Sequence, residues 1–125
     1  MSITLHQGAV DESSLDGLEH LPIESYAKSV NNAVKFLANR YLNDSTKLVA
    51  IRLNIEFRKE IKGNDSWYLN ITTMKIEDFF IELAINICSN DRICAQANIT
   101  VVPFDSIERK MTKLSEEEIN QLQDI

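Results

Sequence analysis

The 125-residue sequence predicts an α+β fold in which a curved antiparallel sheet of five or six strands wraps around one long helix. Residues 23–42 repeat apolar side chains at the three-and-four spacing of a single helical face. Four later stretches alternate apolar and polar residues, which is typical of half-buried strands. Because a long apolar helix face needs a large partner surface, the sheet is expected to cover the helix.

The helix over Ile23–Leu42 has appropriate residues at both of its ends. Pro22 suits the first helical position, where a missing N–H costs nothing. Glu24 in the first turn and Arg40 in the last turn each complement the helix macrodipole. At 1.5 Å per residue the helix is expected to be roughly 30 Å long.

The expected strands follow from alternation and from the turn residues between them. A short strand opens the chain, and the last strand is expected to end before Pro103. The C-terminal stretch predicts a short helix with Ser115 as its N-cap and Glu118 completing a capping box. The predicted strands cover residues 3–7, 49–58, 67–73, 79–87 and 93–101.

The apolar members of the four main strands all have odd numbers, which constrains the hairpin at Asn90-Asp91. A two-residue loop there would put the two apolar faces on opposite sides of the sheet. We therefore expect either an odd loop length or a bulge. One such register sets Cys88 opposite Cys94, and two small packed thiols are then expected rather than a disulfide.

Length and composition predict a single domain over residues 1–125, with 44% hydrophobic residues and only three Gly and two Pro. The net charge of −6 argues against nucleic acid as a partner. No membrane span and no signal peptide are apparent, which predicts a cytoplasmic protein. The two histidines are far apart, and no Cys/His metal spacing or Gly-rich phosphate loop is present. We expect neither a metal nor a cofactor.

One loop has the character of a site, because Asp16, Glu19 and His20 lead directly into the start of the long helix. Helix N-termini carry unpaired N–H groups and a partial positive charge. An oxygen that becomes negative during a reaction is stabilised there, and a nearby carboxylate can act as base or nucleophile.

The same loop resembles that of the hot-dog-fold acyl thioesterases of the 4-hydroxybenzoyl-CoA thioesterase type. In that family the loop commonly reads Asp, two residues, Gly, His, and then a Tyr six residues after the His; Asp16, His20 and Tyr26 fall on these positions. The stretches 92–97 and 102–105 are similar to the last strand of the family and the segment after it. The resemblance covers most of the chain and implies a hot-dog domain.

The resemblance implies hydrolysis of an acyl-CoA or acyl-carrier-protein thioester. It implies that Asp16 is the catalytic carboxylate, which activates water or attacks the carbonyl, and that His20 is a positioning residue. Glu24 is the alternative catalytic acid. The candidate substrate-binding residues are Ile23, Tyr26, Arg58 and Lys59; Arg109, Lys110 and Lys113 are the alternative cations for the phosphates of the carrier.

Two departures from the family pattern leave other readings open. Glu19 replaces the usual Gly, and Pro22-Ile23 replaces a pair of Asn, so the helix start loses one backbone donor. A second reading is a hot-dog dehydratase or hydratase with His20 as base, although the Phe-Pro run usual there is missing. A third is a non-catalytic acyl-binding subunit.

The resemblance also implies a homodimer or a tetramer with the site at the subunit boundary. The strand faces supply aromatic surface beyond what one helix is expected to cover. The residues that predict this contact are Trp67, Tyr68, Phe79 and Phe80.

Overall fold

The computed structural model describes residues 3–9, 21–63 and 65–125, and it confirms the α+β class. The long helix begins at the predicted residue and ends one residue before the predicted end. No helix in the described ranges is long and apolar enough to cross a membrane. The elements are β1 (Ile3–Ala9), α1 (Ile23–Tyr41), β2 (Thr46–Phe57), β3 (Ser66–Ile76), β4 (Ile81–Ser89), β5 (Arg92–Asp105), β6 (Lys110–Met111) and α2 (Glu116–Gln123).

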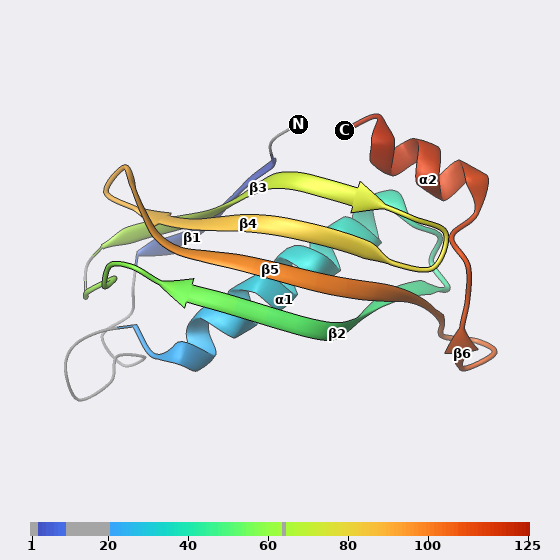
Figure 1. Cartoon of the computed structure of the whole chain (residues 1–125), viewed down its shortest axis with the longest axis horizontal. Coiled ribbons are helices and arrows are strands. Elements are labelled where there is room, and N and C mark those ends of the chain that lie inside the picture. Colours follow the sequence, from blue (N-terminus) through green and yellow to red (C-terminus); the bar gives the residue numbers. More distant parts are fainter. Residues whose placement is uncertain (1–2, 10–20, 64) are drawn as a thin grey trace.

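The six strands form one antiparallel sheet in the order β1-β3-β4-β5-β2, and β6 pairs with the last residues of β5. Helix α1 crosses one face of this sheet (Figure 1). Strands β1 and β2 are the outermost strands on that path. The chain therefore has one helix-covered face and two strand edges.

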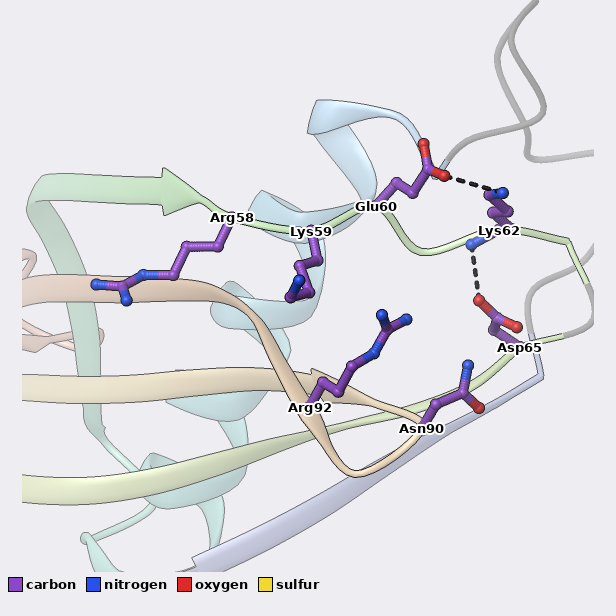
Figure 2. Close-up of a pocket in the computed structure, with 7 residues that line it drawn as sticks. All are labelled: Arg58, Lys59, Glu60, Lys62, Asp65, Asn90 and Arg92. Carbon is purple, nitrogen blue, oxygen red and sulfur yellow. Dashed lines mark hydrogen bonds and ion pairs between the residues drawn. The ribbon is translucent and has the colours of Figure 1, made fainter.

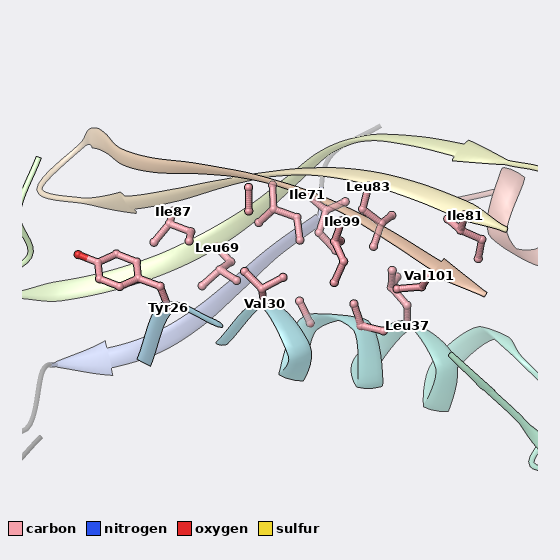
Figure 3. Close-up of a cluster of buried hydrophobic side chains, with 14 of the residues drawn as sticks. Tyr26, Val30, Leu37, Leu69, Ile71, Ile81, Leu83, Ile87, Ile99 and Val101 are labelled. Atoms are coloured by element: carbon pink, nitrogen blue, oxygen red, sulfur yellow. The ribbon is translucent and has the colours of Figure 1, made fainter. Parts of the chain in front are cut away.

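The core lies between α1 and the sheet. Val30 and Leu37 of α1 are fully buried and point toward the apolar side chains of the strands (Figure 3). The facing strand residues include Leu69, Ile85 and Val101, which have 1% exposure or less. Each such side chain contributes about 1.5–3 kcal/mol by burial, so this contact fixes the helix on the sheet.

Two bulges change the alternation that the sequence suggests. The register of β2 against β5 shifts between Ala50 and Arg52, and that of β3 against β4 shifts between Ile71 and Thr73. An inserted residue moves the following side chains to the other face. Val49 therefore does not share a face with the odd-numbered apolar residues that follow its bulge, and Thr73 does not share a face with those that precede its bulge. The expectation that odd-numbered residues form one unbroken face is wrong for both strands.

The β4–β5 hairpin contains a bulge, one of the two predicted alternatives, and the bulge puts the apolar residues of both strands on the same face of the sheet. Its two-residue turn is Asn90-Asp91, and both residues have positive φ, at 53° and 59°. These values suit the tight turns that match strand twist. The register shifts next to the turn, so Cys88 pairs with Ile93 and Cys94 is the extra residue. The possible register that would set Cys88 opposite Cys94 is therefore not the one adopted.

Strand β5 continues through Pro103 to Asp105, which corrects the predicted end of this strand. The Pro103 carbonyl accepts a hydrogen bond from the Thr112 N–H, on the side opposite β2. The ladder between β4 and β5 ends at Val101, so no β4 carbonyl there requires an N–H from Pro103. A proline is tolerated at such a position because no ladder hydrogen bond is lost.

Candidate active site at the start of helix α1

The start of α1 leaves backbone donors available. Pro22 is the N-cap, with φ −72° and ψ 158°, rather than the first helical residue, and it makes no side-chain cap. The Leu21 N–H donates to the Ile61 carbonyl at 2.8 Å, so this donor is used. No described residue accepts a hydrogen bond from the N–H of Ile23 or Glu24. These two N–H groups lie at the positive end of the helix dipole.

A depression of about 300 Å³ lies beside this helix start, and we call it the helix-start pocket. Its apolar side is made by an aromatic pair, since the rings of Tyr26 and Phe57 meet edge to face with centroids 5.0 Å apart. Tyr26 also packs against Trp67, which is buried. The lining residues are Leu21, Ile23, Tyr26, Phe57, Arg58, Lys59 and Glu60.

The end of β2 brings the cations to this pocket. The N–H groups of Arg58 and Lys59 both donate to the carbonyl of Cys94, at 2.8 and 3.0 Å. Cys94 lies on β5 next to Ala95, the residue that pairs with Phe57 at the end of β2. This shared acceptor on β5 fixes the backbone of the two charged residues that follow β2.

A second, larger depression of about 530 Å³ adjoins the first, and we call it the charged pocket. The two pockets share Arg58, Lys59 and Glu60. Figure 2 shows the charged side chains gathered from the end of β2, the β2–β3 connection and the β4–β5 hairpin. The lining residues are Arg58, Lys59, Glu60, Lys62, Asp65, Asn90 and Arg92.

Some of these charges are already paired. Lys62 contacts Glu60 at 2.9 Å, and the hydrogen bond to Glu60 raises the pKa of Lys62 above its ordinary value. Asp65 accepts from the Lys62 N–H at 3.0 Å. Arg58 lies 3.9 Å from Glu56, and both side chains are largely exposed. Exposed pairs of this kind add little stability, so they do not explain why the pocket is charged.

Four of the residues expected at the site come together in the structure. Ile23, Tyr26, Arg58 and Lys59 all line the helix-start pocket, although they come from α1 and from the residues that follow β2. Glu24 lies exposed in the first turn of α1, outside the lining. The two remaining candidates, Asp16 and His20, lie outside the described residues.

Phe57 is a lining residue that was not predicted from the sequence. Its position at the end of an alternating strand suggested a core side chain, whereas it is 48% exposed and closes one side of the pocket. No local signal in the sequence marks it, because its exposure depends on where β2 ends against β5.

No protein-family model matches this sequence, and no curated protein matches it significantly. Solved structures do match, over nearly the whole chain. A 1,4-dihydroxy-2-naphthoyl-CoA thioesterase from Synechocystis is 16% identical with a TM-score of 0.80, covering 100% of this chain and 98% of its own. A thioesterase from Thermus thermophilus, solved with coenzyme A and Zn, is 14% identical with a TM-score of 0.84, and 96% of each chain is covered.

A third similar structure is a hypothetical protein from Staphylococcus aureus in complex with CoA. It is 13% identical with a TM-score of 0.87, and the match covers 99% of this chain and 83% of that one. This protein therefore has the fold of solved thioesterases, consistent with the hot-dog fold that the sequence predicts. At this level of identity the likeness establishes the fold, and the activity has to be argued from the site.

Proposed function

We propose that the protein is a cytoplasmic thioesterase that hydrolyses an acyl-CoA or acyl-carrier-protein thioester in the helix-start pocket. One observation carries the proposal: a pocket with an apolar side is lined by Ile23 at the helix start, where the backbone N–H groups of Ile23 and of the next residue have no acceptor among the described residues. The named thioesterases of the same fold support it. Both cysteines are free thiols, which fits a reducing compartment.

The proposed chemistry uses the positive end of α1. The N–H groups of Ile23 and Glu24 polarise the thioester carbonyl and stabilise the oxyanion that forms when it is attacked. Asp16 activates the attacking water or attacks the carbonyl itself, and His20 positions the reacting groups. Attack by water breaks the carbon–sulfur bond and gives a carboxylic acid and a free thiol; attack by Asp16 releases the thiol and leaves an anhydride, which water then hydrolyses to the same acid. The roles of Asp16 and His20 rest on the family resemblance, and Glu24 is the alternative acid.

Substrate binding is assigned to the lining residues. Ile23 is 68% exposed, and together with Tyr26 it offers an apolar surface to the acyl group. Arg58 and Lys59 are proposed to hold the phosphate-bearing carrier on the other side. In this arrangement α1 serves as the central helix of a hot-dog fold.

A second candidate function is a non-catalytic acyl-binding subunit, which is favoured by the loss of backbone donors at the helix start. The Leu21 N–H is used by Ile61, and Pro22 has no N–H, so two positions that could donate to an oxyanion do not. Fewer donors weaken transition-state stabilisation while the apolar pocket remains able to bind an acyl group.

We also propose that two copies pair along β2, as a homodimer or a dimer of dimers. This edge strand is twelve residues long, and Val49, Ile51 and Leu53 are between 41% and 63% exposed. Long apolar edges are normally covered. The expected contact through Trp67 is wrong, because Trp67 is buried against Tyr26. A copy on β2 lies next to Phe57 and Arg58, so the partner can complete the site.

The test is a panel of acyl-CoA and acyl-carrier-protein thioesters incubated with the purified protein, with thiol release measured. We expect release above the uncatalysed rate for at least one substrate. An enoyl thioester is included, because hydration without thiol release would show a hydratase. Tight acyl-CoA binding with no turnover of any substrate would support the acyl-binding subunit and refute hydrolysis.

A further inference from the structure

The face of the sheet opposite α1 contains a depression of about 440 Å³ that spans four strands, and we call it the open-face pocket. On β4 the buried Leu83 points toward α1 (Figure 3), so Glu82 and Ala84 on either side of it point to the opposite face. The open-face pocket shares no lining residue with the helix-start pocket or with the charged pocket. Its lining residues are Arg52, Asn54, Thr73, Met74, Lys75, Glu82, Leu83, Ala84, Asn98, Ile99 and Thr100.

Two bulges border this pocket. The register of β2 against β5 shifts just before Arg52, and that of β3 against β4 shifts just before Thr73. Because an inserted residue changes which side chains face each side of the sheet, the odd-numbered Thr73 and Lys75 lie on the same face as Arg52. Bulges are frequent beside functional sites, where they redirect side chains. Ala84, which pairs with Thr73, has only a methyl group and leaves space above it.

The charged side chains of this pocket lie in one row across the sheet. Lys75 of β3 pairs with Glu82 of β4. Thr100 of β5 pairs with Glu82 on one side and with Arg52 of β2 on the other. Since neighbouring strands are about 4.8 Å apart, Glu82 is one strand spacing from Lys75 and two spacings, about 10 Å, from Arg52. The order of charges is therefore positive, negative and positive, with the negative charge nearer to Lys75.

These groups are available to a ligand. Arg52 and Glu82 form no ion pair with any residue in the part of the chain that the structure describes. Asn54 and Asn98 pair across β2 and β5, and their side chains make no hydrogen bond within the same described ranges. The pocket volume lies in the range typical of small-molecule sites. Charged groups and free amides together bind small molecules that are themselves charged.

We infer that the open-face pocket binds a free acidic amino acid such as glutamate. The ammonium group of glutamate lies between two carboxylates and is adjacent to the α-carboxylate, so its charges complement those of the pocket in sign and in order. In this arrangement Glu82 binds the ammonium, Lys75 binds the α-carboxylate, and Arg52 binds the side-chain carboxylate beyond Thr100. The inference is independent of the proposed thioesterase function, because the pocket lies on the face of the sheet opposite the core and α1.

The composition of the pocket favours a small polar ligand over a second copy of the chain. The cores of stable subunit contacts are apolar and depleted of charged residues. Every exposed residue that lines this pocket is instead polar or charged. These residues are Arg52, Asn54, Thr73, Lys75, Glu82 and Asn98.

Calorimetry of the full chain with L-glutamate tests the inference, and we expect saturable binding. Arg52→Gln and Glu82→Gln should each weaken binding by about tenfold or more, because each leaves one charge of glutamate unpaired. The matched controls Arg40→Gln and Glu117→Gln remove the same charges at exposed positions outside the pocket and should weaken binding by less than about twofold. No binding by the unaltered protein, or equal weakening in the controls, would overturn the inference.

Two analogues of glutamate then test the assigned contacts. Glutarate lacks the ammonium group, so Glu82→Gln should not weaken its binding. Glutamine lacks the side-chain charge, so Arg52→Gln should change its binding by less than about twofold. If Glu82→Gln weakened glutamate and glutarate equally, the assignment of the pocket to an amino acid would be overturned.

Ala84→Leu fills the space in the pocket and distinguishes a small ligand from a second copy. We expect this variant to weaken glutamate binding by about tenfold or more while its mass by light scattering stays that of the unaltered protein. A smaller assembly in Ala84→Leu, together with no glutamate binding by the unaltered protein, would show that a second copy covers this face and would overturn the inference.

Discussion

At the scale of the residue, Phe57 links the core to the helix-start pocket. Its ring packs edge to face on the buried Tyr26 and leaves about half of its own surface open to the pocket. Such a pair contributes about 0.5–1.5 kcal/mol beyond the area that it buries. Phe57 therefore stabilises the end of β2 and forms the apolar side of the pocket at the same time.

We predict that Phe57→Ala raises KM for an acyl-CoA with an apolar acyl group by about tenfold while kcat stays within about twofold. The reason is that the ring contributes binding to ground state and transition state alike. Steady-state thiol release measures both constants. Ile107→Ala, at a residue that is 79% exposed in the β5–β6 connection, is the control. An unchanged KM in Phe57→Ala would show that the acyl group binds elsewhere.

At the scale of the element, a buried carboxylate joins α2 to the turn between α1 and β2. Glu118 is 3% exposed and accepts hydrogen bonds from the N–H of Asn43 at 3.1 Å and of Ser115 at 3.0 Å. Burial by itself would raise the pKa of Glu118. These hydrogen bonds and those from the hydroxyls of Thr46 and Ser115 outweigh burial, so the pKa lies below its ordinary value of 4.5.

This pKa gives the stability a pH dependence of known sign. A carboxyl group with a lowered pKa in the folded state contributes stability above its unfolded pKa, and the contribution is lost as pH falls through the folded value. We predict that Glu118→Gln costs about 1–3 kcal/mol at pH 7, and that the difference from the unaltered protein shrinks below about pH 4.5. Denaturant unfolding at pH 7 and pH 4 measures it. The control is Glu117→Gln, at an exposed neighbouring residue, and its stability should match that of the unaltered protein. An equal loss of stability in Glu118→Gln at both pH values would contradict this prediction.

The elements also show what the sequence can and cannot specify. Helix α1 and the capping box of Ser115 and Glu118 were predictable, because spacing and caps are local signals. Parity required either an odd loop length or a bulge in the β4–β5 hairpin, but it did not place the bulge at Cys94. The bulges in β2 and β3 were not predictable, because an inserted residue leaves the alternation of the sequence intact while it changes the pairing.

The candidate site divides in the same way. Ile23 and Tyr26 were predictable from the helix start and the family resemblance. That Arg58 and Lys59 lie beside them depends on where β2 ends against β5, which is a property of strand register. Arg92 joins the charged pocket only through the tight turn that precedes it, and no local signal marks it.

At the scale of the whole molecule, the exposed edge of β2 carries the proposed subunit contact. Ile51 is the extra residue of the β2 bulge and is 63% exposed, so a charge there does not disturb the core. We predict that Ile51→Lys converts the dimer to a monomer, because a charge along a pairing edge blocks strand addition. Light scattering at micromolar concentration gives the mass. Ile107→Lys, at a residue that is 79% exposed in the β5–β6 connection, should leave the dimer intact.

Two results would contradict this arrangement. A monomer in the unaltered protein would refute the proposed pairing altogether. A dimer that survives Ile51→Lys would show that the copies meet on another surface.

The central claim is that a thioester is hydrolysed at the start of α1, and the most direct test is thiol release by the Asp16→Asn variant. The substitution keeps the size and turn preference of Asp16 and removes its charge, so folding should be unchanged. Glu19→Gln is the control in the same loop and should shift the pH profile without abolishing turnover. The account predicts that Asp16→Asn lowers turnover by about 10²–10⁴-fold, the range for a lost proton-transfer group. Near-full activity of Asp16→Asn, with Glu19→Gln or Glu24→Gln inactive, would contradict the assignment.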